Sequence, residues 1–286
     1  MPKPVVRRFS SPYIAGPSLD DAVRVVRQLN DAGKQATVDV LGEEITSTGE
    51  AAEITRQYLL ALARIESEGL DANISVKLTG LGLELDRDLC RSNLKALVED
   101  ARARGNFVRI DMEDSSTTDS ALDLYRELRA DGYENLGVVL QAYLRRTLAD
   151  APGLDNVRLC KGIYVEAPSV AFQDAGEIRT SYLATLDELI GQGAYVGVAT
   201  HDEQLIRATL ERLAAGELSD RVEFQMLLGV RPGRGDELVR EGHRLRVYVP
   251  YGTHWYEYSI RRLQENPRIA GYVAADTLRR LRGARP

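Results

Sequence analysis

Strand-like and helix-like segments alternate along almost the whole chain of 286 residues. Short apolar runs rich in β-branched residues are each followed by a longer stretch whose apolar residues recur every three or four positions. The runs cover residues 34–42, 73–81, 107–113, 136–143, 157–165, 195–201, 222–229 and 245–252. They are nearly continuous in apolar residues, which is typical of parallel strands covered on both faces. This alternation predicts an α/β fold built on a parallel sheet.

The number of these units predicts a (β/α)8 TIM-type barrel, which takes about 250 residues. A doubly wound sheet is the alternative, but no GxGxxG pattern follows the first run. A short N-terminal helix is expected at about residues 19–32, because Asp20 and Asp21 suit a helix N-terminus. No linker divides the chain, so residues 1–286 should form one domain. Its barrel would span about residues 34–265 and end in a C-terminal helix 8 over the barrel mouth.

Composition excludes several classes of protein. The net charge is −6 and no basic stripe is present, so we expect no nucleic-acid partner. Cys90 and Cys160 lie far apart without a CxxC or Cys/His cluster, which predicts no metal site and fits a reducing cytoplasm. No apolar stretch reaches the ~20 residues of a membrane span, and no signal-peptide pattern is present. A cytoplasmic location is expected, with peripheral attachment to the inner membrane face left open.

Polar residues gather where the predicted strands end. In an α/β barrel these carboxyl ends meet at one mouth, where the chemistry takes place. Polar residues inside apolar strands are costly unless paired, so their recurrence at one rim is a stronger signal than any single member. The residues concerned are Glu43, Lys77, Asp111, Glu113, Gln141, Arg158, Lys161, Thr200, His201, Gln225 and Tyr248.

Each of these residues also has a structural interpretation. Lys77 and Asp111 could form an ion pair between adjacent strands, and His201 could be a hydrogen-bonded structural histidine. Arg158 and Lys161 could project to opposite faces of their strand, with one of them solvated. For these residues the sequence alone leaves both interpretations open.

The same ambiguity extends to other parts of the rim. Gln141 could satisfy backbone groups, and Tyr248 could be a packing aromatic. The glycine-rich segment 229–235 could cradle a phosphate, as loops after late barrel strands often do. A flexible linker is the preferred interpretation of that segment.

The segment after the last predicted strand places four polar side chains on one helix face. Tyr258, Arg261, Arg262 and Glu265 follow the i, i+3, i+4, i+7 spacing. By itself this pattern is typical of a solvated face with a salt bridge. Because the helix follows the eighth strand of a barrel, it can instead turn this face toward the mouth.

Eight segments of the chain resemble the proline dehydrogenase family. The resemblance extends to the monofunctional bacterial enzymes and to the proline dehydrogenase domain of bifunctional proline-utilisation proteins. The segments run in order from about residue 14 to residue 267, and YSIRRLQE after YGTH is the most specific part. They are TVDVLGE, SVKLTGLG, RIDMED, VVLQAYL, VRLCKGIYVE, VATHDE, EFQMLLG and YVPYGTHWYEYSIRRLQENP.

The resemblance implies a barrel that binds FAD at its mouth without a Rossmann fingerprint. It implies oxidation of L-proline to Δ1-pyrroline-5-carboxylate, the first step of proline catabolism, with hydride transfer from proline C5 to flavin N5. A membrane quinone would then accept the electrons. Pyrroline-5-carboxylate dehydrogenase is a further candidate partner.

The resemblance also implies a substrate site. Arg261 and Arg262 would clamp the proline carboxylate with Lys77 as a third cation, and Tyr248 and Tyr258 would pack against the ring. Guanidinium forks and an ammonium group suit a single carboxylate because the bonds are charge-assisted. Fixing that end of the substrate orients the reacting carbon.

Further roles follow from the same resemblance. Asp111 would hold Lys77 in place, Glu265 would orient the arginine pair, and Glu43 would pair with the first arginine as a gate. Arg158 would lie near flavin N5, where a cation stabilises the reduced cofactor. The residues expected to bind FAD are Gln141, Arg158, Lys161, Gly162, Thr200, His201 and Gln225.

Two other functions remain as alternatives. A Schiff-base lyase or aldolase on the same barrel would use Lys77 as nucleophile and would need that amine desolvated and unpaired. A non-catalytic barrel that binds an amino acid would bind proline without electron transfer.

Overall fold

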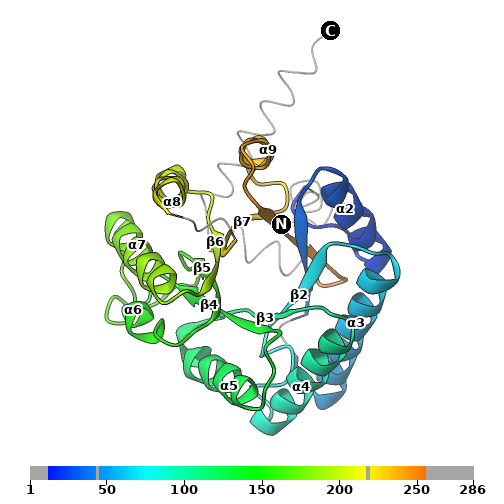
Figure 1. Cartoon of the computed structure of the whole chain (residues 1–286). Coiled ribbons are helices and arrows are strands. Elements are labelled where there is room, and N and C mark those ends of the chain that lie inside the picture. Colours follow the sequence, from blue (N-terminus) through cyan, green and yellow to red (C-terminus); the bar gives the residue numbers. More distant parts are fainter. Residues whose placement is uncertain (1–11, 43–44, 217–219, 256–286) are drawn as a thin grey trace, which may run out of the picture.

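The computed structural model describes residues 12–42, 45–216 and 220–255. Within them, parallel strands close into a barrel in sequence order from β1 to β8, and helices surround it (Figure 1). The predicted (β/α)8 barrel is confirmed. The predicted C-terminal helix 8 lies outside the described residues. So do five predicted site residues, Glu43, Tyr258, Arg261, Arg262 and Glu265.

Each strand pairs in parallel with the next one, and β8 pairs with β1. Every predicted run overlaps one strand and continues past its carboxyl end into the loop, because the loop residues are also partly apolar. The strands are β1 Gln35–Val40, β2 Ala72–Val76, β3 Val108–Ile110, β4 Leu136–Gln141, β5 Asn156–Cys160, β6 Tyr195–Ala199, β7 Val222–Leu227 and β8 Leu245–Tyr251.

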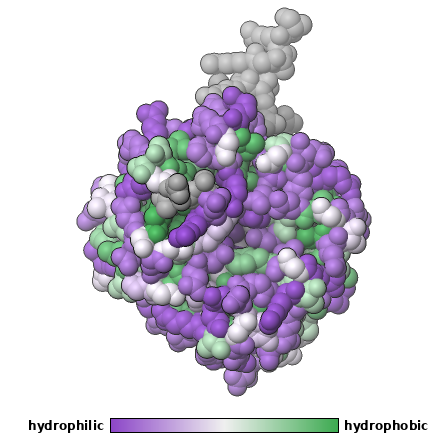
Figure 2. Space-filling model, in the orientation of Figure 1, coloured by the Kyte–Doolittle hydropathy of each residue, from purple (hydrophilic) through white to green (hydrophobic). Residues whose placement is uncertain are grey.

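The helices form the outer ring (Figure 1), and the face of the molecule seen in Figure 2 is mostly hydrophilic. The expected N-terminal helix is α2, which Ser18 and Asp21 begin with reciprocal capping bonds. It packs against β1 and β8. The described helices are α2 Leu19–Asp31, α3 Thr48–Ser67, α4 Arg87–Ala103, α5 Thr118–Ala130, α6 Thr147–Asp150, α7 Ala175–Gly191, α8 Glu203–Ala215 and α9 Pro232–Arg240, with the 3-10 turn η1 Ser115–Thr117.

The glycine-rich segment 229–235 is not a flexible linker, so that prediction was wrong. Its last four residues form the first turn of α9, with Pro232 at the first helical position. Proline suits that position because its fixed φ fits a helix and no backbone donor is needed there.

Side chains on each strand alternate between two environments. The outward ones are apolar and form the core between sheet and helices, as Val38, Ile74 and Val108 do. The expectation of nearly continuous apolar strands is therefore wrong. Many inward positions are polar, whereas branched apolar residues usually fill such barrels. These inward polar residues include Thr37, Asp39, Ser75, Arg109, Arg158, Glu223, Gln225, Arg246 and Tyr248.

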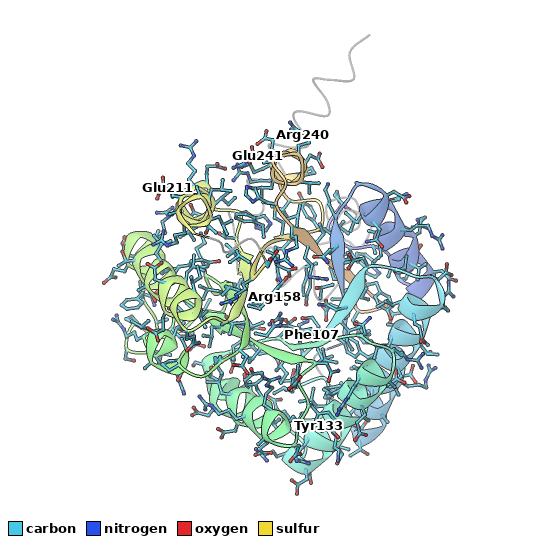
Figure 3. The ribbon with its side chains drawn as sticks, in the orientation of Figure 1. Phe107, Tyr133, Arg158, Glu211, Arg240 and Glu241 are labelled. Carbon is cyan, nitrogen blue, oxygen red and sulfur yellow. The ribbon has the colours of Figure 1, made fainter. Side chains whose placement is uncertain are left out.

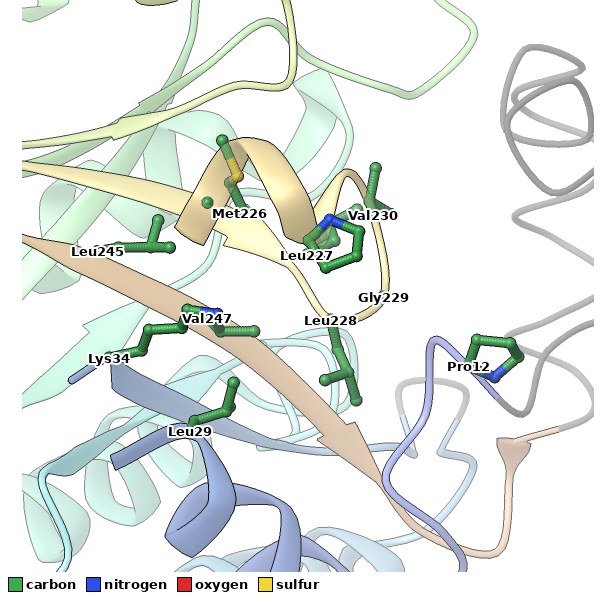
Figure 4. Close-up of a pocket in the computed structure, with 12 residues that line it drawn as sticks. Pro12, Leu29, Lys34, Met226, Leu227, Leu228, Gly229, Val230, Leu245 and Val247 are labelled. Carbon is green, nitrogen blue, oxygen red and sulfur yellow. The ribbon is translucent and has the colours of Figure 1, made fainter. Parts of the chain in front are cut away.

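A pocket of about 430 Å³ lies between α2 and α9 (Figure 4). Its walls are mostly apolar and include Leu29 of α2 and the β8 residues Leu245 and Val247. Lys34 lines it too, and its ammonium lies 2.5 Å from Asp236. Because alternate residues of β8 face opposite sides, this pocket lies outside the barrel, away from the polar interior.

Candidate active site

A buried ion pair lies at the carboxyl ends of β1 and β2. Lys77 follows the last residue of β2, and its Nζ lies 2.9 Å from each carboxylate oxygen of Asp39. The hydroxyl of Tyr58 in α3 donates to Asp39 at 3.0 Å. Burial raises the pKa of Tyr58 well above its usual value, so this hydroxyl keeps its proton. Among the described residues, the carboxylate closest to Lys77 is therefore that of Asp39, which was not predicted as a site residue from the sequence.

Asp111 follows β3 and connects three other strands. Its Oδ1 accepts hydrogen bonds from Arg158 Nη1 at 2.6 Å and from the Ser75 hydroxyl at 2.7 Å. Its Oδ2 accepts from the Tyr248 hydroxyl at 2.7 Å and lies 3.9 Å from Lys77 Nζ. Burial would raise the pKa of Asp111, but Arg158 and Lys77 outweigh it and the pKa is lowered. Asp111 thus pairs closely with Arg158 and only at longer range with Lys77.

Tyr248 of β8 joins the two ion pairs. Its hydroxyl accepts a hydrogen bond from Lys77 Nζ at 3.2 Å and donates to Asp111. The guanidinium carbon of Arg158 lies 5.3 Å from the centre of its ring. A cation at that distance is attracted to the ring face. One network therefore connects Lys77 to Arg158 across the mouth.

Arg158 of β5 points into the barrel (Figure 3). Its Nε donates to Gln225 Oε1 at 2.6 Å, and Gln225 Nε2 in turn donates to Glu223 at 2.5 Å. Glu223 was not selected from the sequence, although it stands two residues before Gln225. Its carboxylate also accepts from Arg246 at 2.8 Å and from Tyr195 at 2.7 Å. Arg158 is held from one side by Asp111 and from the other by Gln225.

Two residues predicted to bind the cofactor, Gln141 and His201, make hydrogen bonds to the protein backbone, as their structural interpretations proposed. Gln141 Nε2 donates to the backbone oxygen of Glu113 at 2.7 Å. His201 Nε2 accepts from the backbone N–H of Leu227 at 3.0 Å. These contacts fix both side chains at the ends of β4 and β6.

Lys161 and Thr200 both contact Asp202, the residue that caps α8. Lys161 Nζ lies 3.1 Å from Asp202 Oδ2, which also accepts from Arg179 at 2.8 Å. Thr200 Oγ1 accepts from the backbone N–H of Asp202 at 3.1 Å. The Lys161 side chain is 38% exposed, whereas that of Arg158 is 8% exposed. The two cations thus differ in solvation, as the structural interpretation allowed.

Gly162 sits where no larger residue fits. Its φ is 102°, and an added Cβ would lie 2.1 Å from the ring of Tyr143. We expect Gly162→Ala to lower the free energy of unfolding by about 1–3 kcal/mol more than Gly153→Ala, because it adds overpacking to backbone strain. Gly153 is the matched control, since its φ is 78° and nothing lies near its Cβ position. Urea unfolding of both variants checks this, and equal losses would contradict it.

The donors at this rim suit FAD, which is anionic and rich in acceptors. Arg158 and Lys161 supply positive charge, and Thr200 supplies a hydroxyl. The hydroxyl of Tyr143 is buried and has no hydrogen-bond partner within the described part of the chain. A buried donor of this kind is normally satisfied, so a bound group with acceptors would fit beside it. The described residues contain no cluster of acidic, histidine and cysteine side chains that could hold a metal ion.

Comparison with known proteins identifies relatives over nearly the whole chain. The model of the family described as proline dehydrogenase matches residues 22–275. Proline dehydrogenase 1 of Bacillus subtilis subsp. natto is 38% identical over 273 residues, covering 94% of this chain and 90% of that protein. Proline dehydrogenase of Deinococcus radiodurans is 36% identical over 276 residues, covering 93% and 89%.

A solved structure is also similar to the chain. The crystal structure of proline utilization A (PutA) from Bdellovibrio bacteriovorus, inactivated by N-propargylglycine, is similar to the chain with a TM-score of 0.82 and 25% identity. The match covers 91% of this chain but 32% of PutA, so the chain spans about a third of that longer protein. The family match, the two bacterial relatives and this barrel confirm the resemblance noted in the sequence. The chain belongs to the proline dehydrogenase family.

Proposed function

We propose that the chain catalyses the FAD-dependent oxidation of L-proline to Δ1-pyrroline-5-carboxylate. The observation that carries this proposal is the buried network at the barrel mouth, in a chain of this family. The network places an ammonium, a tyrosine and a guanidinium in one hydrogen-bonded set, through Lys77, Tyr248 and Arg158. Such a set can bind a small amino acid at one end and a cofactor at the other.

In this proposal Lys77 binds the carboxylate of proline. Asp39 and Tyr248 fix its ammonium in position, so little freedom is lost when substrate binds. Arg261 and Arg262 would complete the clamp, and Tyr258 would pack against the ring with Tyr248. Glu265 would orient the arginines, and Glu43 would close over the substrate. These last roles rest on the sequence motif.

Bound FAD would supply the hydride acceptor for C5 of proline. The residues proposed to hold it are Gln141, Arg158, Lys161, Gly162, Thr200, His201 and Gln225. Arg158 would place a fixed positive charge beside the cofactor, because Asp111 and Gln225 hold its guanidinium. A pre-oriented charge of this kind lowers the cost of charge that develops during reaction.

The electron acceptor and the location are also proposals. A membrane quinone would take the electrons, and pyrroline-5-carboxylate dehydrogenase would take the product. A cytoplasmic chain, attached peripherally at the inner membrane face, would reach such a quinone. Across the described residues, the helices are too short or too polar to cross a bilayer.

The structure disfavours the Schiff-base alternative. That reaction needs an unpaired lysine, whereas Lys77 contacts both carboxylate oxygens of Asp39. A non-catalytic barrel that binds an amino acid is distinguished by electron transfer, which it would lack.

The purified chain, reconstituted with FAD, should show flavin absorbance that bleaches when L-proline is added without oxygen. In Arg262→Met the flavin should remain bound, but the proline concentration for half-maximal bleaching should rise about 10- to 150-fold, because a charge-assisted bond worth about 1.5–3 kcal/mol is lost. Anaerobic titration followed by absorbance measures both. Bound flavin that proline never bleaches would support the non-catalytic barrel and refute the proposal.

A further inference from the structure

A chain of hydrogen bonds leads from Arg158 down into the barrel to Glu223. Arg158 Nε donates to Gln225 Oε1, and Gln225 Nε2 donates to Glu223 Oε1. Both Gln225 and Glu223 lie on β7 and face inward, and they are 5% and 1% exposed. Solvent therefore has almost no part in setting this arrangement.

The chemistry of Glu223 decides which way the Gln225 amide points. A carboxylate accepts hydrogen bonds but cannot donate them, so the amide must turn its NH2 group toward Glu223. Its oxygen is then left facing Arg158 Nε, which can only donate. With the amide reversed, two donors would face each other at Arg158.

We propose that Glu223 is a positioning residue that fixes the orientation of Arg158 through the amide of Gln225. The inference rests on the proposed function, in which Arg158 lies beside the flavin. Glu223 itself touches neither substrate nor cofactor in this account.

The surroundings hold both side chains in this arrangement. Tyr195 donates to Glu223 Oε2, and Arg246 Nε donates to Oε1. Burial would raise the pKa of Glu223, but Arg246 and these hydrogen bonds outweigh it and the pKa is lowered, which favours the acceptor-only form. On the neighbouring strand β6, Gly197 lies opposite Glu223, and an added Cβ there would lie 2.3 Å from Gln225 Nε2. The glycine leaves room for the amide beside Glu223.

Glu223→Gln tests this inference because it keeps the shape and removes the constraint. A glutamine at 223 can donate as well as accept, so the Gln225 amide can reverse. The Nε–Hε signal of Arg158 reports its hydrogen bond directly, and Arg158→Lys identifies that signal in nitrogen–proton NMR spectra. In the chain without flavin we expect the signal to shift or broaden in Glu223→Gln.

Two further variants separate this role from simple charge pairing with Arg246. Tyr195→Phe removes one bond to Glu223 but keeps the carboxylate, so the Arg158 signal should stay in place. Glu223→Gln combined with Gln225→Glu restores an acceptor facing Arg158 and should return the signal. If Glu223 served only as the counter-charge of Arg246, the combined variant would not recover. An unchanged signal in Glu223→Gln, or no recovery in the combined variant, overturns the inference.

FAD affinity provides a second test of the positioning role of Glu223. We expect Glu223→Gln to weaken FAD binding about tenfold, because Arg158 no longer holds one orientation. Tyr195→Phe should leave the FAD affinity unchanged, and flavin fluorescence measures the affinity of both variants.

If the unaltered chain binds no FAD, the proposed function fails, while the NMR result still tests the positioning role. If the chain binds FAD but Glu223→Gln keeps the signal and the affinity, only the positioning role fails. Should Glu223→Gln not fold, the combined variant still decides between the two roles.

Discussion

Asp111→Asn is expected to lower the free energy of unfolding by about 3–5 kcal/mol and to abolish tight FAD binding. The substitution leaves the guanidinium of Arg158 buried beside a neutral amide, and breaking one side of a buried ion pair carries a cost of this size. It also disturbs the hydroxyl of Tyr248, which donates to Asp111 Oδ2. Urea unfolding and flavin fluorescence measure the two losses.

Asp119→Asn is the matched control. Asp119 pairs with Arg146 at 2.6 Å, but its side chain is 76% exposed, so its loss should cost at most about 1 kcal/mol. Acid provides a second check. Because the pKa of Asp111 is lowered on folding, its contribution is fully present above about pH 4 and is lost as pH falls through the lowered value. The gap between Asp111→Asn and the unaltered chain should therefore close at low pH. Equal losses in the two variants would contradict the buried role of Asp111.

The barrel could be predicted because its signal is local. Each strand–helix unit shows its own apolar pattern, and eight such units in sequence leave few topologies. The positions of the strand ends were predicted less accurately, since β2 stops at Val76 while the predicted run continues to residue 81. The alternation of polar and apolar positions along the strands was also missed, because a single polar residue in an apolar run looks like an exception.

The sequence predicted which residues lie at the site better than it predicted which of them contact one another. Lys77 and Asp111 were paired because their strands are adjacent, but Lys77 lies closer to Asp39 on the other neighbouring strand. Which neighbour a side chain contacts depends on the barrel register, where Asp39 lies opposite Ser75, two residues before Lys77. That register is not visible in the sequence.

Glu223 and His201 show two other limits of predicting the site from the sequence. A lone carboxylate inside an apolar run is a usable signal, but its partner Arg246 lies 23 residues away and belongs to another strand. His201 was assigned to the cofactor, and the structure shows its Nε2 accepting from the backbone of β7. The cofactor role of His201 stays a prediction. Sequence patterns select residue types suited to a site, whereas three-dimensional contacts decide how each residue is used.

Lys77→Met should lower stability and proline binding together, for two separable reasons. It leaves the fully buried carboxylate of Asp39 without the ammonium, at a cost of about 3–5 kcal/mol. It also removes one cation from the proposed carboxylate site, so the proline KM should rise about 10- to 150-fold. Urea unfolding and steady-state rates with an artificial electron acceptor measure the two effects.

Combining Lys77→Met with Asp39→Asn separates them. Removing both charges of a buried pair is often close to neutral, so most of the lost stability should return. The proline KM should stay high, because the ammonium is still absent. A KM that recovers along with stability would show that Lys77 acts only as the counter-charge of Asp39. A KM that stays high in a stable protein would assign Lys77 to the substrate and leave Asp39 the task of holding it.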